Sequence, residues 1–124
     1  MEADVAGGPR AAARARRLLE TELADRLDES RLADVALLTT ELIANGVRHG
    51  GGDTDRCLRL LVEGTRLGVR VEVTNADATF GDIAPRAPDL AGGGGIGLQL
   101  VDRLASRWGV REAQPSAVWF EMDW

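Results

Sequence analysis

The most informative stretch of the sequence is Glu41-Leu-Ile-Ala-Asn45-Gly-Val-Arg48-His49-Gly50. At 100° per residue, Glu41, Asn45 and either Arg48 or His49 lie on one polar stripe of a helix, beside its apolar face. A carboxylate one turn from an amide can accept a proton while the amide oxygen ligates a hard cation such as magnesium. Taken alone, such a pair is more often a solvated helix edge, and a histidine near a helix end is more often a cap than a ligand.

A second informative stretch is Gly92-Gly93-Gly94-Gly95-Ile96-Gly97-Leu98, which precedes the last expected helix. Glycines at a helix N-terminus let backbone N–H groups approach a phosphate, and the helix dipole favours the negative charge. A flexible linker is the competing interpretation of consecutive glycines. The same letters match a dinucleotide fingerprint, but that motif follows the first strand of a repeated βαβ sheet, and this one comes late in the sequence.

The hydrophobic pattern around these two stretches predicts an alternation of helices and short strands. Apolar residues at spacings of three and four predict helices over residues 9–27, 30–49 and 96–108. Period-two alternation and short apolar runs predict strands over residues 56–63, 67–74, 110–113 and 117–122. The first two strands form a hairpin through a short link. The sequence therefore predicts an α/β two-layer sandwich with three helices on one face of a largely antiparallel sheet.

Length and composition indicate one domain and exclude several classes of protein. The 124 residues, 44% of them hydrophobic, suit a single domain over residues 9–124 after a flexible N-terminus over residues 1–8. A formal net charge of −5 disfavours nonspecific binding of nucleic acid. The arginines between Arg10 and Arg17 are more often a solvated helix face than a binding patch. With one cysteine, Cys57, and neither a signal peptide nor a membrane-spanning run, we expect a cytoplasmic protein.

The order and spacing of these motifs resemble the GHKL ATPase superfamily, whose members include gyrase and histidine kinases. Residues 41–50 resemble its N-box, residues 71–75 the strand that leads to the adenine-recognition position, and residues 95–101 the second glycine box. Residues 104–110 and 118–121 are similar to the compact branch of anti-sigma regulatory factors, which are serine-protein kinases. The resemblance covers nearly the whole chain.

The resemblance implies the Bergerat fold, with ATP and Mg2+ held between the N-box helix and a lid at about residues 76–95. It implies that Glu41 is the general base and that Asn45 is the metal ligand. The remaining nucleotide contacts that it implies are Arg48, His49, Asn75, Asp77, Gly93, Gly94, Gly95, Gly97 and Leu98.

Members of this branch bind a sigma factor and phosphorylate a serine or threonine of an anti-anti-sigma partner, and they suggest a homodimer. The leading expectation is therefore an ATP-dependent serine/threonine kinase that sequesters a sigma factor. The alternative is a regulator that kept the fold and holds its partner with weak or no catalysis. A detached catalytic domain of a histidine kinase ranks lower, because no dimerisation helix with a phosphorylatable histidine is present.

Three departures from the family pattern bear on this choice. Asn75 stands where the family usually has Asp, and Asp77 is the nearest carboxylate that could replace it. Pro115-Ser116-Ala117 replaces the usual Gly-Lys or Gly-Thr before the last strand. The strand that often precedes the first helix is expected to be truncated. The first two departures favour the weakly catalytic alternative.

Overall fold

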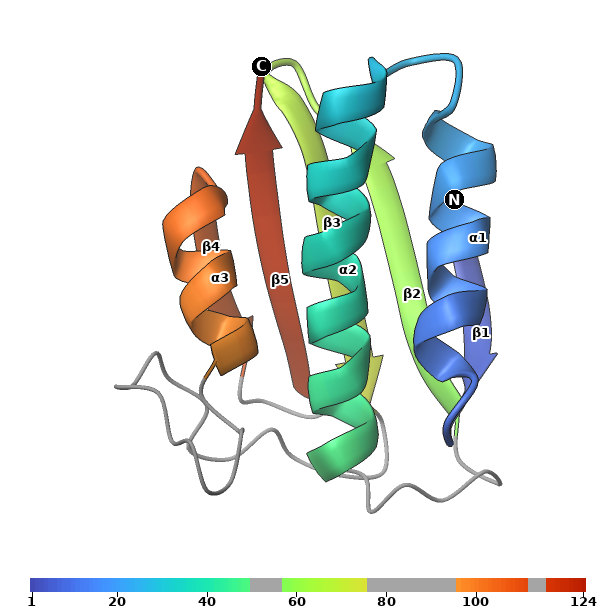
Figure 1. Ribbon diagram of the computed structural model, residues 1–124. Helices are drawn as coiled ribbons and strands as arrows, with labels where there is room; N and C mark the ends of the chain where they lie inside the picture. Colours follow the sequence, from blue (N-terminus) through green and yellow to red (C-terminus); the bar gives the residue numbers. More distant parts are fainter. Residues whose placement is uncertain (50–56, 76–95, 112–115) are drawn as a thin grey trace.

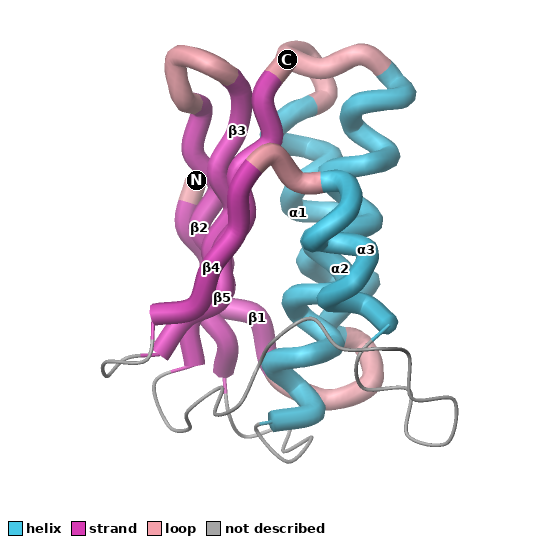
Figure 2. Tube along the Cα trace, turned by 90° about the vertical axis from the view of Figure 1, so that its left-hand side faces the viewer, coloured by secondary structure: helices cyan, strands magenta, loops and turns pink. Residues whose placement is uncertain are grey.

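The computed structural model describes residues 1–49, 57–75, 96–111 and 116–124. In chain order, the elements of these residues are β1 (Glu2–Ala6), α1 (Ala11–Leu23), α2 (Glu29–His49), β2 (Cys57–Gly64), β3 (Gly68–Asn75), α3 (Ile96–Leu104), β4 (Arg107–Arg111) and β5 (Ser116–Asp123). The strands form one sheet in the order β1-β2-β3-β5-β4, and every neighbouring pair of described strands is antiparallel. All three described helices cover the same face of the sheet (Figures 1 and 2). The predicted two-layer α/β sandwich is confirmed.

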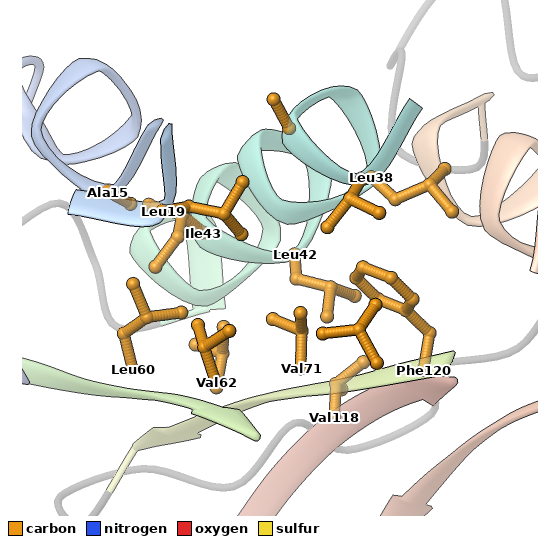
Figure 3. Packing of buried hydrophobic residues seen from close by; sticks show 14 of the residues in the cluster. Ala15, Leu19, Leu38, Leu42, Ile43, Leu60, Val62, Val71, Val118 and Phe120 are labelled. Carbon is orange, nitrogen blue, oxygen red and sulfur yellow. The ribbon is translucent and has the colours of Figure 1, made fainter. Parts of the chain in front are cut away.

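The core lies between the sheet and the helices, as the period-two pattern of the strands predicts. In β3 every second residue is fully buried, at Val69, Val71 and Val73. Figure 3 shows side chains of the sheet, such as Val71 and Phe120, meeting Leu42 of α2. Burial of a side chain of this size contributes about 1.5–3 kcal/mol. The central strands and α2 are therefore held by the apolar faces that the sequence pattern identifies.

The first residues form a strand, which corrects the expectation that this strand is truncated. β1 pairs with β2 so that Val5 lies opposite Leu58, and Val5 is fully buried. On the outer face, Arg59 of β2 binds Glu2 at 2.9 Å and Asp4 at 3.2 Å. The local sequence gives little sign of this strand, because Val5 is its single large apolar residue inside the strand and its partners lie more than fifty residues further along the chain.

The third helix is shorter than predicted, and the strand after it begins earlier. α3 ends at Leu104, and Trp108 belongs to β4, which runs from residue 107 to 111 instead of beginning at residue 110. Trp108 extends the helical spacing of Val101 and Ala105, and this spacing suggested a longer helix. Pairing of β4 with β5 and a hydrogen bond from Trp108 Nε1 to Asp102 Oδ1 at 2.9 Å favour the strand. The bounds of β2, β3 and β5 differ from prediction by one residue at each end.

The outer face of the sheet carries a ladder of ion pairs. Arg70 binds Glu121 at 2.9 Å and stacks on Trp119, with 4.2 Å from its guanidinium carbon to the ring centre. Further pairs join Arg70 and Arg111 to Glu72, and Arg107 to both Glu121 and Asp123. The hydrogen bond with Asp123 is the main cause that raises the pKa of Arg107 above its ordinary value. Every arginine on a described strand thus has a carboxylate partner.

Gly68→Ala is expected to destabilise the protein strongly, whereas Gly64→Ala in the same hairpin should not. A Cβ at Gly68 would lie 1.8 Å from the Met122 carbonyl oxygen, which is backbone and cannot move alone. We expect a loss of about 3 kcal/mol in the free energy of unfolding. At Gly64 the nearest atom is Arg26 Nη1 at 3.3 Å, at the end of a flexible side chain. Urea unfolding of both variants tests the contrast, and equal midpoints would contradict it.

Candidate functional site

Four segments that are distant in the sequence end at one end of the sandwich. The C-terminal end of α2 and the N-terminal end of α3 lie beside the end of β3 and the start of β5 (Figure 1). The register fixes the two strands there, because Asn75 pairs with Ser116. The end of α2, the end of β3 and the start of α3, to which the sequence assigns the expected nucleotide contacts, therefore meet at a common end of the molecule.

Glu41 and Asn45 lie one turn apart on α2, along the edge of its buried face. Leu38 and Leu42 of the same helix are fully buried against the sheet, and Glu41 is half-buried beside them. Among the described residues the Glu41 carboxylate has no hydrogen bond or ion pair, so it is free to accept a proton. Sequence spacing predicts this pair on one stripe, and the helix has this geometry.

The amide of Asn45 is buried without a partner at its nitrogen. The residue is 4% exposed, and within the described part of the chain Nδ2 has no hydrogen-bond acceptor. A buried unsatisfied polar group costs about 1–3 kcal/mol. Few such groups occur in native proteins, and each needs a specific explanation. Because the terminal amide torsion is broad and roughly two-fold, Asn45 can present its oxygen at the same position. This arrangement is consistent with an amide that binds a ligand.

Gly46 explains how α2 lies close enough to the sheet to bury Asn45. A Cβ at this position would stand 3.1 Å from Leu58 Cδ1 of β2 and 3.6 Å from Val73 Cγ1 of β3. The glycine therefore lets the last turns of the helix rest directly on the two strands. Sequence reasoning did not single out Gly46, although a glycine inside an apolar helical pattern is a signal of close backbone approach.

The start of α3 supplies the second element of the site. The first turn of a helix leaves backbone N–H groups without partners inside the helix, and these groups favour an anion. Leu98, two residues into α3, is 5% exposed, so its side chain anchors this end of the helix in the protein. Gly97 belongs to the same turn. The predicted contacts at Gly93, Gly94 and Gly95 lie outside the described residues.

Ser116, which belongs to the Pro115-Ser116-Ala117 departure from the family pattern, lies at this end of the sheet. It begins β5, is fully buried and pairs with Asn75. The loss of a phosphate contact at this departure stays a prediction. Ser116 continues the alternation of Val118, Phe120 and Met122, which are buried on the helix-facing side. That alternation identifies the side of β5 on which Ser116 lies. A hydroxyl group is therefore kept at this end of the sheet.

The remaining predicted site residues are placed only in part. Arg48 and His49 form the last residues of α2, and Asn75 is the last residue of β3. Asp77 and the predicted lid at residues 76–95 lie outside the described residues. The roles of these residues in binding a nucleotide stay predictions.

The fold and the meeting of the three motifs define an ATP-binding domain of the GHKL type. The family model of the histidine kinase-like ATPase domain matches residues 5–122, so the chain belongs to this family. No curated protein matches the sequence. Within the described ranges, no helix has both the length and the apolar composition that crossing a membrane requires.

Proposed function

We propose that the protein binds ATP with Mg2+ and transfers the γ-phosphate to a serine or threonine hydroxyl of a partner protein. The observation that carries this proposal is the pair on α2: a free carboxylate at Glu41, one turn from the unpartnered buried amide of Asn45. A hydrolase or kinase needs a base at this point, whereas a purely structural helix would gain stability from an apolar residue at position 45.

The residues present fit a magnesium nucleotide. An amide oxygen is a ligand that Mg2+ accepts, and Mg2+ takes most of its other ligands from phosphates and water. The N-terminal end of α3 offers backbone N–H groups to phosphate oxygens. When bound, Mg2+ neutralises the charge that develops on the transferring phosphoryl group. Asn45 would hold the cation, and α3 would hold the phosphates.

Glu41 would accept the proton of the attacking hydroxyl. The hydroxyl oxygen forms a bond to the γ-phosphorus, the bond from phosphorus to the bridging oxygen breaks, and ADP leaves. The proton moves to the Glu41 carboxylate, which has no competing partner among the described residues. Glu41 is half-buried, so part of its side chain packs against the protein and part stays accessible to a substrate.

The partner proteins of this proposal are a sigma factor, which the protein would sequester, and an anti-anti-sigma protein, which it would phosphorylate. The support is the similarity of residues 104–110 and 118–121 to the anti-sigma branch. Purified anti-anti-sigma protein and ATP labelled at the γ-phosphate test the reaction directly. Incorporation of label on serine or threonine is expected. ATP binding without transfer would favour the alternative, a regulator with weak or no catalysis.

Asn75→Asp is expected to tighten ATP binding by about 1 kcal/mol, a factor of roughly five. A hydrogen bond from the adenine amino group to a carboxylate contributes about 1.5–3 kcal/mol, and one to a neutral amide oxygen about 0.5–1.5 kcal/mol. The variant should also select ATP over GTP more sharply, because guanine has a carbonyl where adenine has the amino group.

Calorimetric titration with ATP and GTP measures both effects, and Asn75→Leu should abolish measurable binding. Asp77→Asn serves as the control for the neighbouring carboxylate. If Asn75 only terminates its strand, both substitutions at position 75 would leave the dissociation constant within about twofold. In that case a loss of affinity in Asp77→Asn would assign the adenine contact to Asp77.

A further inference from the structure

Three arginines form an exposed stripe on α1. Arg10, Arg14 and Arg17 are spaced by four and three residues, so they lie on one side of the helix over about 10 Å. None of the three has an ion-pair partner in the described part of the chain. The neighbouring Arg16 differs, because it binds Glu20 at 2.7 Å. We call Arg10, Arg14 and Arg17 the arginine stripe.

The arginine stripe is unfavourable for the stability of α1. The N-terminal end of a helix is the positive end of its dipole, so cations there are unfavourable. The first turn of α1 has no acidic residue, and Arg10 at the N-cap position makes no side-chain capping bond. Like charges at spacings of three and four also repel one another, by a few tenths of a kcal/mol for each pair. Local rules that are broken without compensation are typical of functional surfaces.

The surroundings make this stripe distinctive within the protein. The chain carries a formal net charge of −5, and the arginines of the described strands are all paired with carboxylates. α1 lies at the edge of the helical layer, where α2 is its neighbouring helix (Figure 1). The three guanidinium groups therefore face solvent at an accessible border of the molecule.

We propose that the arginine stripe binds an acidic helix of a partner protein, with carboxylates at positions i, i+4 and i+7. Such a helix repeats the spacing of Arg10, Arg14 and Arg17, and an arginine can bind a carboxylate with two parallel hydrogen bonds. A nucleic acid fits less well, because three arginines neutralise few of its phosphates and the remaining phosphates would face an acidic protein, whereas three arginines match all three carboxylates of such a helix. None of the three arginines is among the residues proposed to bind the nucleotide, so we expect this binding to need no ATP.

The test uses two synthetic helical peptides of identical composition. One carries glutamates at i, i+4 and i+7 on a single face, and the other distributes them around the helix. The patterned peptide should bind the unmodified protein at least about fivefold more tightly than the other peptide does. Its affinity should fall as the salt concentration rises. Substitution of all three arginines by glutamine should remove this preference. Arg103→Gln is the matched control, since Arg103 is exposed on α3 without an ion pair among the described residues.

Thermal unfolding supplies the second measurement. Arg14→Gln should raise the melting temperature of the free protein and weaken its binding of the patterned peptide by about threefold. If Arg14 only supported the helix, its substitution would lower the melting temperature and leave the affinity for the peptide unchanged. Equal binding of both peptides, or tighter binding of a duplex DNA than of the patterned peptide, would overturn the proposal. Glu41→Gln should bind the peptide normally, so a failure of the proposed kinase function would not be mistaken for a failure of this surface.

Discussion

Glu41→Gln is expected to lower the rate of phosphoryl transfer by about a hundredfold to ten-thousandfold, the usual contribution of a general base. Glutamine keeps the size of the side chain and its position on α2, but its amide cannot take the proton of the attacking hydroxyl. The affinity for ATP should stay within about twofold, because the proposed contacts to the nucleotide come from Asn45, α3 and the end of β3. Single-turnover kinetics with saturating nucleotide separates these two quantities.

Asp34→Asn provides the matched control for this experiment. Asp34 lies on the same helix, is exposed, and has no ion pair among the described residues. Its substitution removes one negative charge from α2 and should leave the transfer rate unchanged. An unchanged rate in Glu41→Gln would remove Glu41 from the mechanism. An equal loss in both variants would mean that the net charge of the helix, and not the base, sets the rate.

The elements with strong periodicity are the ones that the sequence predicts well. The alternation of Val69, Val71 and Val73 identifies β3 and its buried face, because the side-chain period of a strand is two. α2 is equally clear from its apolar stripe. β1 is missed because five residues with one large apolar side chain, Val5, carry almost no periodic signal. Its stability comes from partners on β2, and a local pattern cannot show a contact of that separation.

The features of the site also differ in whether a local sequence pattern can predict them. The spacing of Glu41 and Asn45 needs only the geometry of one helix, so the sequence predicts that they lie together. The pairing of Asn75 with Ser116 depends on the register between β3 and β5, which are more than thirty residues apart in the chain. The burial of Asn45 depends on how closely Gly46 brings α2 to the sheet. Neither feature can be derived from spacing alone.

Asn45→Leu is expected to stabilise the free protein and to abolish magnesium-dependent ATP binding. Leucine has a similar size and removes the buried Nδ2 that lacks an acceptor among the described residues, which costs about 1–3 kcal/mol. The gain in the free energy of unfolding should reach about 1 kcal/mol, because leucine fits the site imperfectly. Loss of the metal ligand should weaken ATP binding in Mg2+ by at least about 100-fold, the upper end of what loss of an outer-shell partner costs.

Two control variants give this prediction its force. Thr39→Val removes another buried polar group of α2, but the Thr39 hydroxyl donates to the Val35 carbonyl at 2.8 Å, so no gain in stability is expected. Asn45→Asp keeps an oxygen ligand and should retain magnesium-dependent binding while it destabilises the free protein by burying a charge. Urea unfolding and calorimetry with and without Mg2+ measure both quantities. If Asn45→Leu lowered stability as well as affinity, the amide would be a structural group with a partner of its own. A gain in stability together with a loss of binding, with binding retained in Asn45→Asp, is the result expected if the unsatisfied amide is kept for a ligand.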